Sequence, residues 1–186
     1  MAQPVRKSAT YEDILALPEN VIGEILGGEL HVQPRPASPH QRAATVLTSD
    51  LGGPFDRGKG GPGGWVILYE VELHLGPDVL VPDLSGWRRE RMPVMPDVPY
   101  MTLAPDWACE VLSPSTTRVD RVKKLPIFAR ERVRHVWLVD PAEHVLEVFR
   151  LDGETYRVIA TFGGDDPVRP EPFDAVPLDL AAVWSR

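Results

Sequence analysis

The sequence has little cysteine and no long apolar run, and each shortage excludes a class of protein. Cys109 is the single cysteine among 186 residues, so no disulfide can form within the chain. The chain contains no stretch of about 20 apolar residues, the length that a membrane-spanning helix needs. Residues 1–10 are polar, with two cations and no apolar signal core. We therefore expect a soluble, cytoplasmic protein that makes no membrane contact.

Positive charge is also scarce, which bears on nucleic-acid binding. Lys and Arg number 20 against 27 Asp and Glu, a net charge of −7, whereas phosphate contacts need Lys and Arg. The bases are nevertheless clustered: residues 115–135 hold seven bases and two acids, so the local charge is 7 − 2 = +5. We predict nucleic-acid contacts from this segment and from a second cluster, through Arg88, Arg89, Arg118, Arg121 and Lys123. A solvated surface without a ligand is the alternative interpretation.

Two carboxylates interrupt segments that otherwise read as buried strands. Asp83 follows the apolar run 79–82, and Glu110 lies inside the run 107–112. An ionised carboxylate in a core strand costs several kcal/mol unless a cation or hydrogen-bond donors meet it. Lys124 follows one short segment later, so the pattern predicts a metal site with a positively charged lysine beside it. Zinc is excluded as the metal because no Cys or His pairs stand at ligand spacing.

Each of these residues also has a purely structural interpretation. Asp83 could end a strand, and Glu110 could form a buried ion pair with an arginine. Asp120 and Lys124 are four residues apart, the spacing of an ordinary ion pair on a helix surface. Pro126 disfavours regular helical geometry just after Lys124, so the helix must start late or bend there.

The order of Pro82-Asp83, then Glu110, then Lys124 resembles the restriction-endonuclease-like PD-(D/E)xK superfamily, with Leu112 standing where a lysine is expected. Within it, the chain resembles the Uma family, in which the following helix supplies the lysine. The resemblance covers roughly residues 10–160, and its further matches are Tyr11, residues 23–30, Pro39-His40, residues 113–116, Asp120, Phe128 and residues 135–141.

The resemblance implies a site and an activity. It implies a Mg²⁺ (or Mn²⁺) ion on Asp83, Glu110 and the backbone carbonyl of Val111, with Lys124 orienting water or stabilising phosphoryl charge. It places another acidic residue at Glu70, and its early acidic and histidine positions fall on Glu24 and His40, which are then expected around the metal. The alternative is structural: Glu24 would only close the hairpin at Gly27-Gly28, and His40 would cap or pack at a helix start as a neutral ring. The implied substrate is DNA, and cleavage of both strands favours a homodimer.

Chain patterns predict a mixed α/β fold, with a central mixed sheet flanked by helices, and the resemblance implies that this sheet forms a restriction-endonuclease-like core. We expect a disordered tail at residues 1–9 and one domain over residues 10–186. Thr10 caps a short helix, and a hairpin turns at Gly27-Gly28. Ser38 caps a second helix that ends at residues 52–54, and further strands are expected at 107–112, 133–139, 145–150 and 155–160, with a short helix at 180–184.

The hairpin of residues 65–75 and 79–85 is expected to bring carboxylates together. If Pro77 and Asp78 are its turn residues, Gly76 pairs with Val79 and Glu72 faces Asp83. The register thus selects Glu72, whereas the resemblance selects Glu70, and both stay open. A shift of one residue would break the alignment.

Three functions are compatible with these patterns. The leading hypothesis is a Mg²⁺-dependent endonuclease that hydrolyses DNA phosphodiester bonds. The second is a non-catalytic binding or regulatory module that keeps the nuclease fold, which the overall acidity favours. The third is a metal-dependent hydrolase of another phosphate ester.

Overall fold

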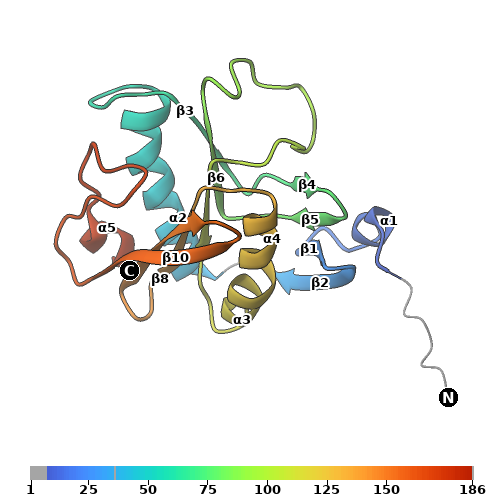
Figure 1. The fold of residues 1–186 in the computed structure, drawn as a ribbon. Helices are drawn as coiled ribbons and strands as arrows, with labels where there is room; N and C mark the ends of the chain where they lie inside the picture. The colour runs from blue at the N-terminus through green and yellow to red at the C-terminus, as the bar shows by residue number, and fades with distance from the viewer. Residues whose placement is uncertain (1–7, 36, 186) are drawn as a thin grey trace.

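The computed structural model describes residues 8–35 and 37–185, with a six-stranded sheet at its centre (Figure 1). Its strands follow the order β10-β9-β8-β7-β6-β3. Their bounds are β3 Trp65–Tyr69, β6 Leu84–Arg88, β7 Trp107–Val111, β8 His135–Asp140, β9 Val145–Asp152 and β10 Thr155–Gly163. Only β7 and β8 of these neighbours are parallel, so the sheet is mixed and the predicted fold class is confirmed.

The parallel pair β7 and β8 requires a crossover connection. It consists of α3 (Thr117–Val119), a π-helical turn η2 (Asp120–Lys124) and α4 (Leu125–Arg130). This is the predicted basic helix, and its π-helical turn is the bend that Pro126 requires. Proline cannot donate a hydrogen bond to the preceding turn, and its ring crowds the carbonyl group four residues earlier.

A second, four-stranded antiparallel sheet lies beside the first and has the order β2-β1-β5-β4. Its strands are β1 Val21–Leu26, β2 Glu29–Pro34, β4 Leu73–Leu75 and β5 Asp78–Leu80. The predicted first hairpin is confirmed. Its turn residues Gly27 and Gly28 have φ values of 62° and 79°, which favour glycine.

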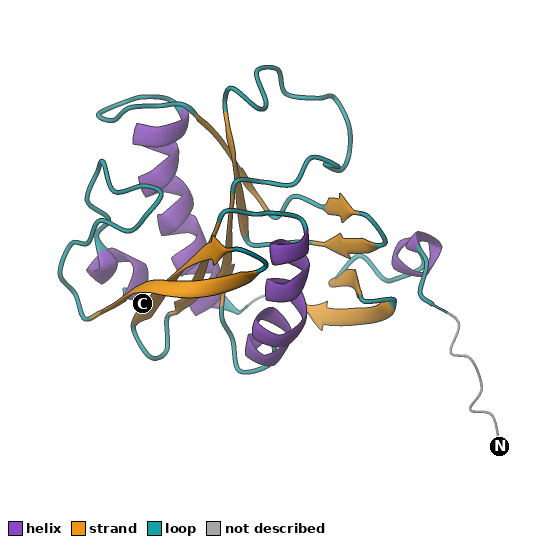
Figure 2. Ribbon diagram, in the orientation of Figure 1, coloured by secondary structure: helices purple, strands orange, loops and turns teal. Residues whose placement is uncertain are grey.

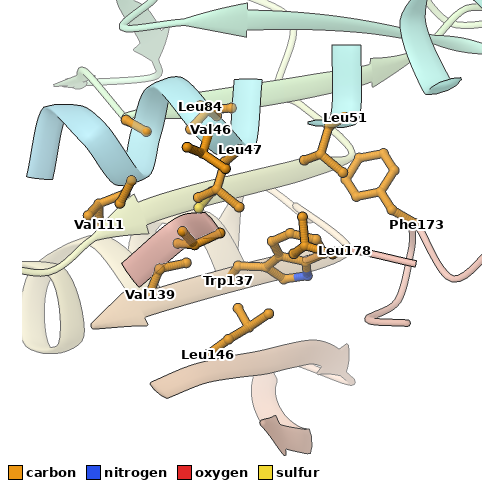
Figure 3. Packing of buried hydrophobic residues seen from close by; sticks show 14 of the residues in the cluster. Val46, Leu47, Leu51, Leu84, Val111, Trp137, Val139, Leu146, Phe173 and Leu178 are labelled. Atoms are coloured by element: carbon orange, nitrogen blue, oxygen red, sulfur yellow. The ribbon is translucent and has the colours of Figure 1, made fainter. Parts of the chain in front are cut away.

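Helices cover both faces of the six-stranded sheet (Figure 2). The helices α2 (Ser38–Leu51) and α5 (Leu180–Trp184) pack on one face, over a core that includes Phe173 (Figure 3). A second core on the other face joins α4 to the four-stranded sheet. Trp107, Cys109 and Val111 of β7 belong to the first core, whereas Ala108 belongs to the second. Because side chains alternate along a strand, Glu110 points to the second side.

The predicted hairpin of residues 65–75 and 79–85 forms with a different register. Leu75 pairs with Asp78, so Gly76 and Pro77 form the turn. The backbone N–H of Glu70 consequently donates to the carbonyl of Asp83 at 3.0 Å, and the alignment of Glu72 with Asp83 was wrong. The turn lies one residue earlier than predicted, because Gly76 accepts a positive φ of 62° and because the buried carboxylate of Asp78 holds that residue in the strand.

The hairpin is also broken in the middle of both arms. Residues 70–72 separate β3 from β4, and residues 81–83 separate β5 from β6, so its two halves belong to different sheets. Pro82 has no N–H for a ladder, and Glu70 takes a left-handed φ of 44°. The predicted site residues therefore lie where the two sheets diverge.

The predicted helix ends need two corrections. The carbonyl of Ala37 accepts the first helical hydrogen bond, from Gln41, so α2 includes Ser38 instead of being capped by it. The glycines at 52 and 53 do not end the helical conformation, since a π-helical turn η1 (Gly52–Asp56) follows α2. Burial of Phe55 against Phe173, at a ring distance of 4.8 Å, stabilises that extra turn.

The chain ends agree with the predicted order of elements. Thr10 donates its backbone N–H to Asp13 at 2.8 Å at the start of α1 (Tyr11–Leu15). Residues 1–7 of the expected disordered tail lie outside the described residues, and Ala9 donates to the carbonyl of Gly28. None of the described helices has the length and apolar composition that crossing a bilayer demands.

Candidate active site

Asp83 lies where the ladder between β6 and β7 ends. Its Oδ2 accepts a hydrogen bond from the backbone N–H of Val111 at 2.7 Å, beyond the last paired residues of the two strands. The same oxygen lies 3.2 Å from Nε2 of His40, which α2 brings from the other side. The carboxylate is therefore fixed by the sheet and by a helix, and it is only 9% exposed.

Glu110 is buried in the middle of the molecule. Its Oε2 accepts a hydrogen bond from Nζ of Lys124 at 3.1 Å. Its Oε1 is also buried and has no hydrogen-bond partner within the described part of the chain. Burial raises the pKa of Glu110 well above its usual range, and Lys124 opposes that rise. A buried carboxylate oxygen without a donor is costly, and a cation would satisfy it.

Lys124 is buried among three carboxylates. Its Nζ lies 3.0 Å from Glu24, 3.1 Å from Glu110 and 3.4 Å from Asp120. Burial alone would lower the pKa of Lys124, but the surrounding carboxylates, Glu110 foremost, raise it well above its usual range. The lysine is therefore a charged ammonium at neutral pH.

The π-helical turn and a distant strand together build this arrangement. In η2 the N–H of Leu125 donates to the carbonyl of Asp120, five residues back. Glu24 comes from β1 of the other sheet, and its Oε1 also accepts a hydrogen bond from the N–H of Val81 at 2.7 Å. Residues far apart in the sequence thus meet at one ammonium group.

Of the two acidic residues that the sequence left open, only Glu70 lies at the site. Its carboxylate accepts a hydrogen bond from the Tyr69 hydroxyl at 2.9 Å and lies 3.8 Å from Arg35. Glu72 instead contacts the Tyr11 hydroxyl at 2.8 Å and His74 at 2.6 Å, outside the cavity described next.

A cavity of about 330 Å³ opens between the two sheets and α2. The predicted residues that line it are His40, Glu70, Asp83, Glu110, Val111 and Lys124. Glu24 lies behind Lys124 and does not line it. The remaining lining residues include Arg35, Asp120 and the hydroxyl-bearing segment of Ser113, Ser115 and Thr116. The cavity wall therefore carries more negative than positive charge.

Comparison with known proteins assigns the chain to a family. The family model described as "Uma2: Putative restriction endonuclease" matches residues 10–181. The chain belongs to the Uma2 family. The resemblance noted from the sequence is thereby confirmed, and membership supports a nuclease role for this Uma2 chain. No curated protein matches it.

A solved structure shares the fold. The crystal structure titled a "putative nuclease belonging to DUF820", from Anabaena variabilis, is 24% identical, has a TM-score of 0.75, and is matched over 95% of this chain and 97% of that one. At this identity the similarity shows the fold alone. The predicted restriction-endonuclease-like core of the Uma2 chain is confirmed.

The basic residues predicted to contact nucleic acid lie outside the cavity of the Uma2 chain. Arg88 is five residues beyond Asp83, about 16 Å along the strand, and its guanidinium lies 4.0 Å from the Trp65 ring. The others are exposed or partly exposed on η2, α3 and the end of β6, and most are paired with acids: Arg89 with Asp56, Arg121 with Glu147 and Lys123 with Glu29. Arg118 forms no ion pair with any described residue.

Two residues of the cavity were missed from the sequence. Asp120 was matched to the family pattern and interpreted as a surface partner of Lys124, without a role in the site, yet it is 2% exposed and its backbone N–H donates to the carbonyl of Thr116 at 3.0 Å. The four-residue spacing was a usable signal for it. Arg35 follows a strand without any motif, so no sequence signal indicated that it would reach the cavity.

Proposed function

We propose that this Uma2 family member is a Mg²⁺-dependent or Mn²⁺-dependent endonuclease that hydrolyses DNA phosphodiester bonds. The observation that carries the proposal is the buried Oε1 of Glu110, which has no partner among the described residues and belongs to a residue lining the same cavity as Asp83. A buried carboxylate oxygen without a hydrogen-bond partner is costly to the fold unless a cation binds it.

The donor set fits a hard divalent cation. Carboxylate and carbonyl oxygens are the ligands that Mg²⁺ prefers, with water and substrate completing its six positions. Asp83, Glu110 and the carbonyl of Val111 would hold it, and Glu70 and Asp120 are further carboxylates on the cavity wall. Within residues 8–35 and 37–185, no three His, Cys, Asp or Glu side chains are placed to hold a metal ion together. When bound, such an ion would activate water and neutralise phosphoryl charge.

The protein's own residues would orient and bind the substrate. His40 fixes the direction of the Asp83 carboxylate through its 3.2 Å contact. Lys124 contributes a fixed positive charge beside Glu110 while phosphoryl charge develops. Arg35 has a side chain 58% exposed, lies 3.8 Å from Glu70 and donates to the carbonyl of Glu19 at 3.4 Å, so its guanidinium keeps further N–H donors for a backbone phosphate.

A non-catalytic nucleic-acid-binding or regulatory module is the second candidate. The pairing of Arg89, Arg121 and Lys123 with acids favours the regulatory form of this candidate, because these bases must leave their partners before they can contact phosphates. A hydrolase of a small phosphate ester is the third candidate, and the cavity volume of about 330 Å³ favours it.

Cleavage and metal binding together test the proposal. We expect the wild-type protein to cut plasmid DNA with Mg²⁺ or Mn²⁺ and to stop when the metal is chelated. Asp83→Asn and Glu110→Gln should lower cleavage by about a hundredfold or more and weaken Mn²⁺ binding in calorimetry, because each removes a charged ligand. Glu72→Gln is the matched control, since that carboxylate lies outside the cavity.

The outcomes separate the three candidates. Undiminished Mn²⁺ affinity in both site variants would remove the metal site and the proposal with it. DNA binding without cleavage under any metal would favour the binding module. Hydrolysis of small phosphate esters, with plasmid left intact, would favour the third candidate.

A further inference from the structure

The ammonium group of Lys124 has three N–H donors, and three carboxylates surround it. The contacts to Glu24, Glu110 and Asp120 range from 3.0 to 3.4 Å, and each of the four side chains is at most 4% exposed. Although Lys124 lines the cavity, its ammonium lies against three carboxylates of the protein and donates to Glu110 at 3.1 Å. An ammonium held in this way is directed toward the protein's own acids instead of a substrate.

The three carboxylates are not equivalent. Glu24 is held from outside by the N–H of Val81, and Asp120 by its place one turn before Lys124, where its backbone N–H donates to the carbonyl of Thr116 at 3.0 Å. Both have anchors that do not depend on the metal site. Glu110 contacts Lys124 through Oε2 alone, and its Oε1 has no partner within the described residues.

We propose that Lys124 is a permanent internal cation, clamped by Glu24 and Asp120, that holds Glu110 by one oxygen and leaves the other for the divalent ion. Glu24 and Asp120 are then positioning residues that act on the metal through Lys124 and do not bind it. The inference rests on the proposed metal-dependent function and assigns roles that the function alone does not require.

The proposal predicts how the loss of Glu24 affects metal binding. In Glu24→Gln the ammonium has one charged acceptor fewer, so it competes with the divalent ion for Oε1 of Glu110. We expect Mn²⁺ affinity, measured by calorimetry, to fall about tenfold. In Lys124→Met no ammonium competes for Glu110. Adding Glu24→Gln to this variant should therefore change the logarithm of the Mn²⁺ affinity by less than half of the change that Glu24→Gln causes in the wild-type protein. Glu72→Gln is the control and should have no effect in either background.

The metal-free protein provides a second readout. Lys124→Met leaves buried carboxylates without their cation, so the melting temperature should fall by about 10 °C. Adding Glu24→Gln to it should restore part of that loss because one buried charge is removed. If Lys124→Met does not fold, Asp120→Asn replaces it: by the same competition it should lower Mn²⁺ affinity to an extent similar to Glu24→Gln.

Equal effects of Glu24→Gln on Mn²⁺ affinity with and without Lys124 would overturn the inference, because Glu24 would then act on the ion without the lysine. Unchanged affinity in Asp120→Asn would overturn it as well. Neither result would contradict the proposed function, because DNA cleavage by the wild-type protein is measured separately. Conversely, a wild-type protein that binds Mn²⁺ but cuts no DNA would contradict the proposed function and leave the clamp supported by the affinity measurements.

Discussion

His40 and His135 are both buried beside a carboxylate, yet their pKa values move in opposite directions. Burial lowers the pKa of both rings. At His40 the hydrogen bond and charge of Asp83, aided by Asp120, outweigh burial and raise the pKa. At His135 the contact with Glu171, at 3.3 Å, is too weak to do so, and the pKa is lowered. The charge around each ring, more than its burial, decides its behaviour.

We predict that the two histidines titrate on opposite sides of about pH 6.5, the value for a free histidine. The NMR signals of the ring protons should show His40 titrating above that pH and His135 below it. As the pH falls below about 6.5, His135 takes up a proton in the unfolded chain while it stays neutral in the folded protein. The contribution of His135 to the stability of the fold is therefore lost toward lower pH. His135→Gln should reduce the loss of unfolding free energy between pH 7 and pH 5.5. A His135 that titrates above His40 would contradict the prediction.

At the scale of elements, one buried carboxylate ties the two hairpins of the small sheet to α4. Asp78 begins β5 and is fully buried. It accepts a hydrogen bond from the N–H of Gly27 at 2.6 Å and lies 2.8 Å from Arg130, which also donates to the carbonyl of Leu75. Because the same sheet carries Glu24, this contact supports the position of the candidate site.

Asp78→Ala should therefore destabilise the fold by about 2 kcal/mol, since it removes a hydrogen bond to a charged acceptor. Urea denaturation measures the change. Asp78→Asn is the matched control: its amide oxygen can still accept from Gly27, so it should cost less than the alanine variant. Equal stability of the wild type and Asp78→Ala would show that the contact contributes nothing.

At the scale of the whole molecule, charge is distributed differently from what the sequence suggested. The segment 115–135 has a local charge of +5, but Arg121 pairs with Glu147, Lys123 with Glu29, and Arg130 with Asp78. Acids from β2, β5 and β9 thus neutralise much of the basic surface. Any contact with DNA phosphates must compete with these pairs, and it should weaken as salt concentration rises.

We predict that the protein forms a two-fold symmetric dimer, because cutting both strands of a duplex needs two opposed sites and symmetric pairs are the commonest assembly. Light scattering at micromolar concentration should give twice the chain mass of 20.7 kDa. The measurement should be made at physiological salt, since the net charge of −7 makes two copies repel each other at low ionic strength. A monomer mass would contradict the prediction.

Much of the architecture followed from local sequence patterns. The apolar positions of α2, the glycine turn at Gly27-Gly28 and the closing hairpin of β9 and β10 all formed as expected. These features depend on residues close together in the chain, whose periodicity and turn chemistry are visible in one sequence. The order of Asp83, Glu110 and Lys124 likewise pointed to one site, and all three line one cavity.

Only the tertiary structure decided the contacts between remote segments. A one-residue change in the hairpin turn placed Glu70 instead of Glu72 opposite Asp83. The order of strands brought Glu24 to Lys124. The position of the chain after β2 placed Arg35 on the cavity wall. Such pairings depend on register and on strand order, and moving the turn by one residue changes by two positions the residue that lies opposite Asp83. The sequence therefore determined which residues are available to the candidate site, and the fold determined which of them meet.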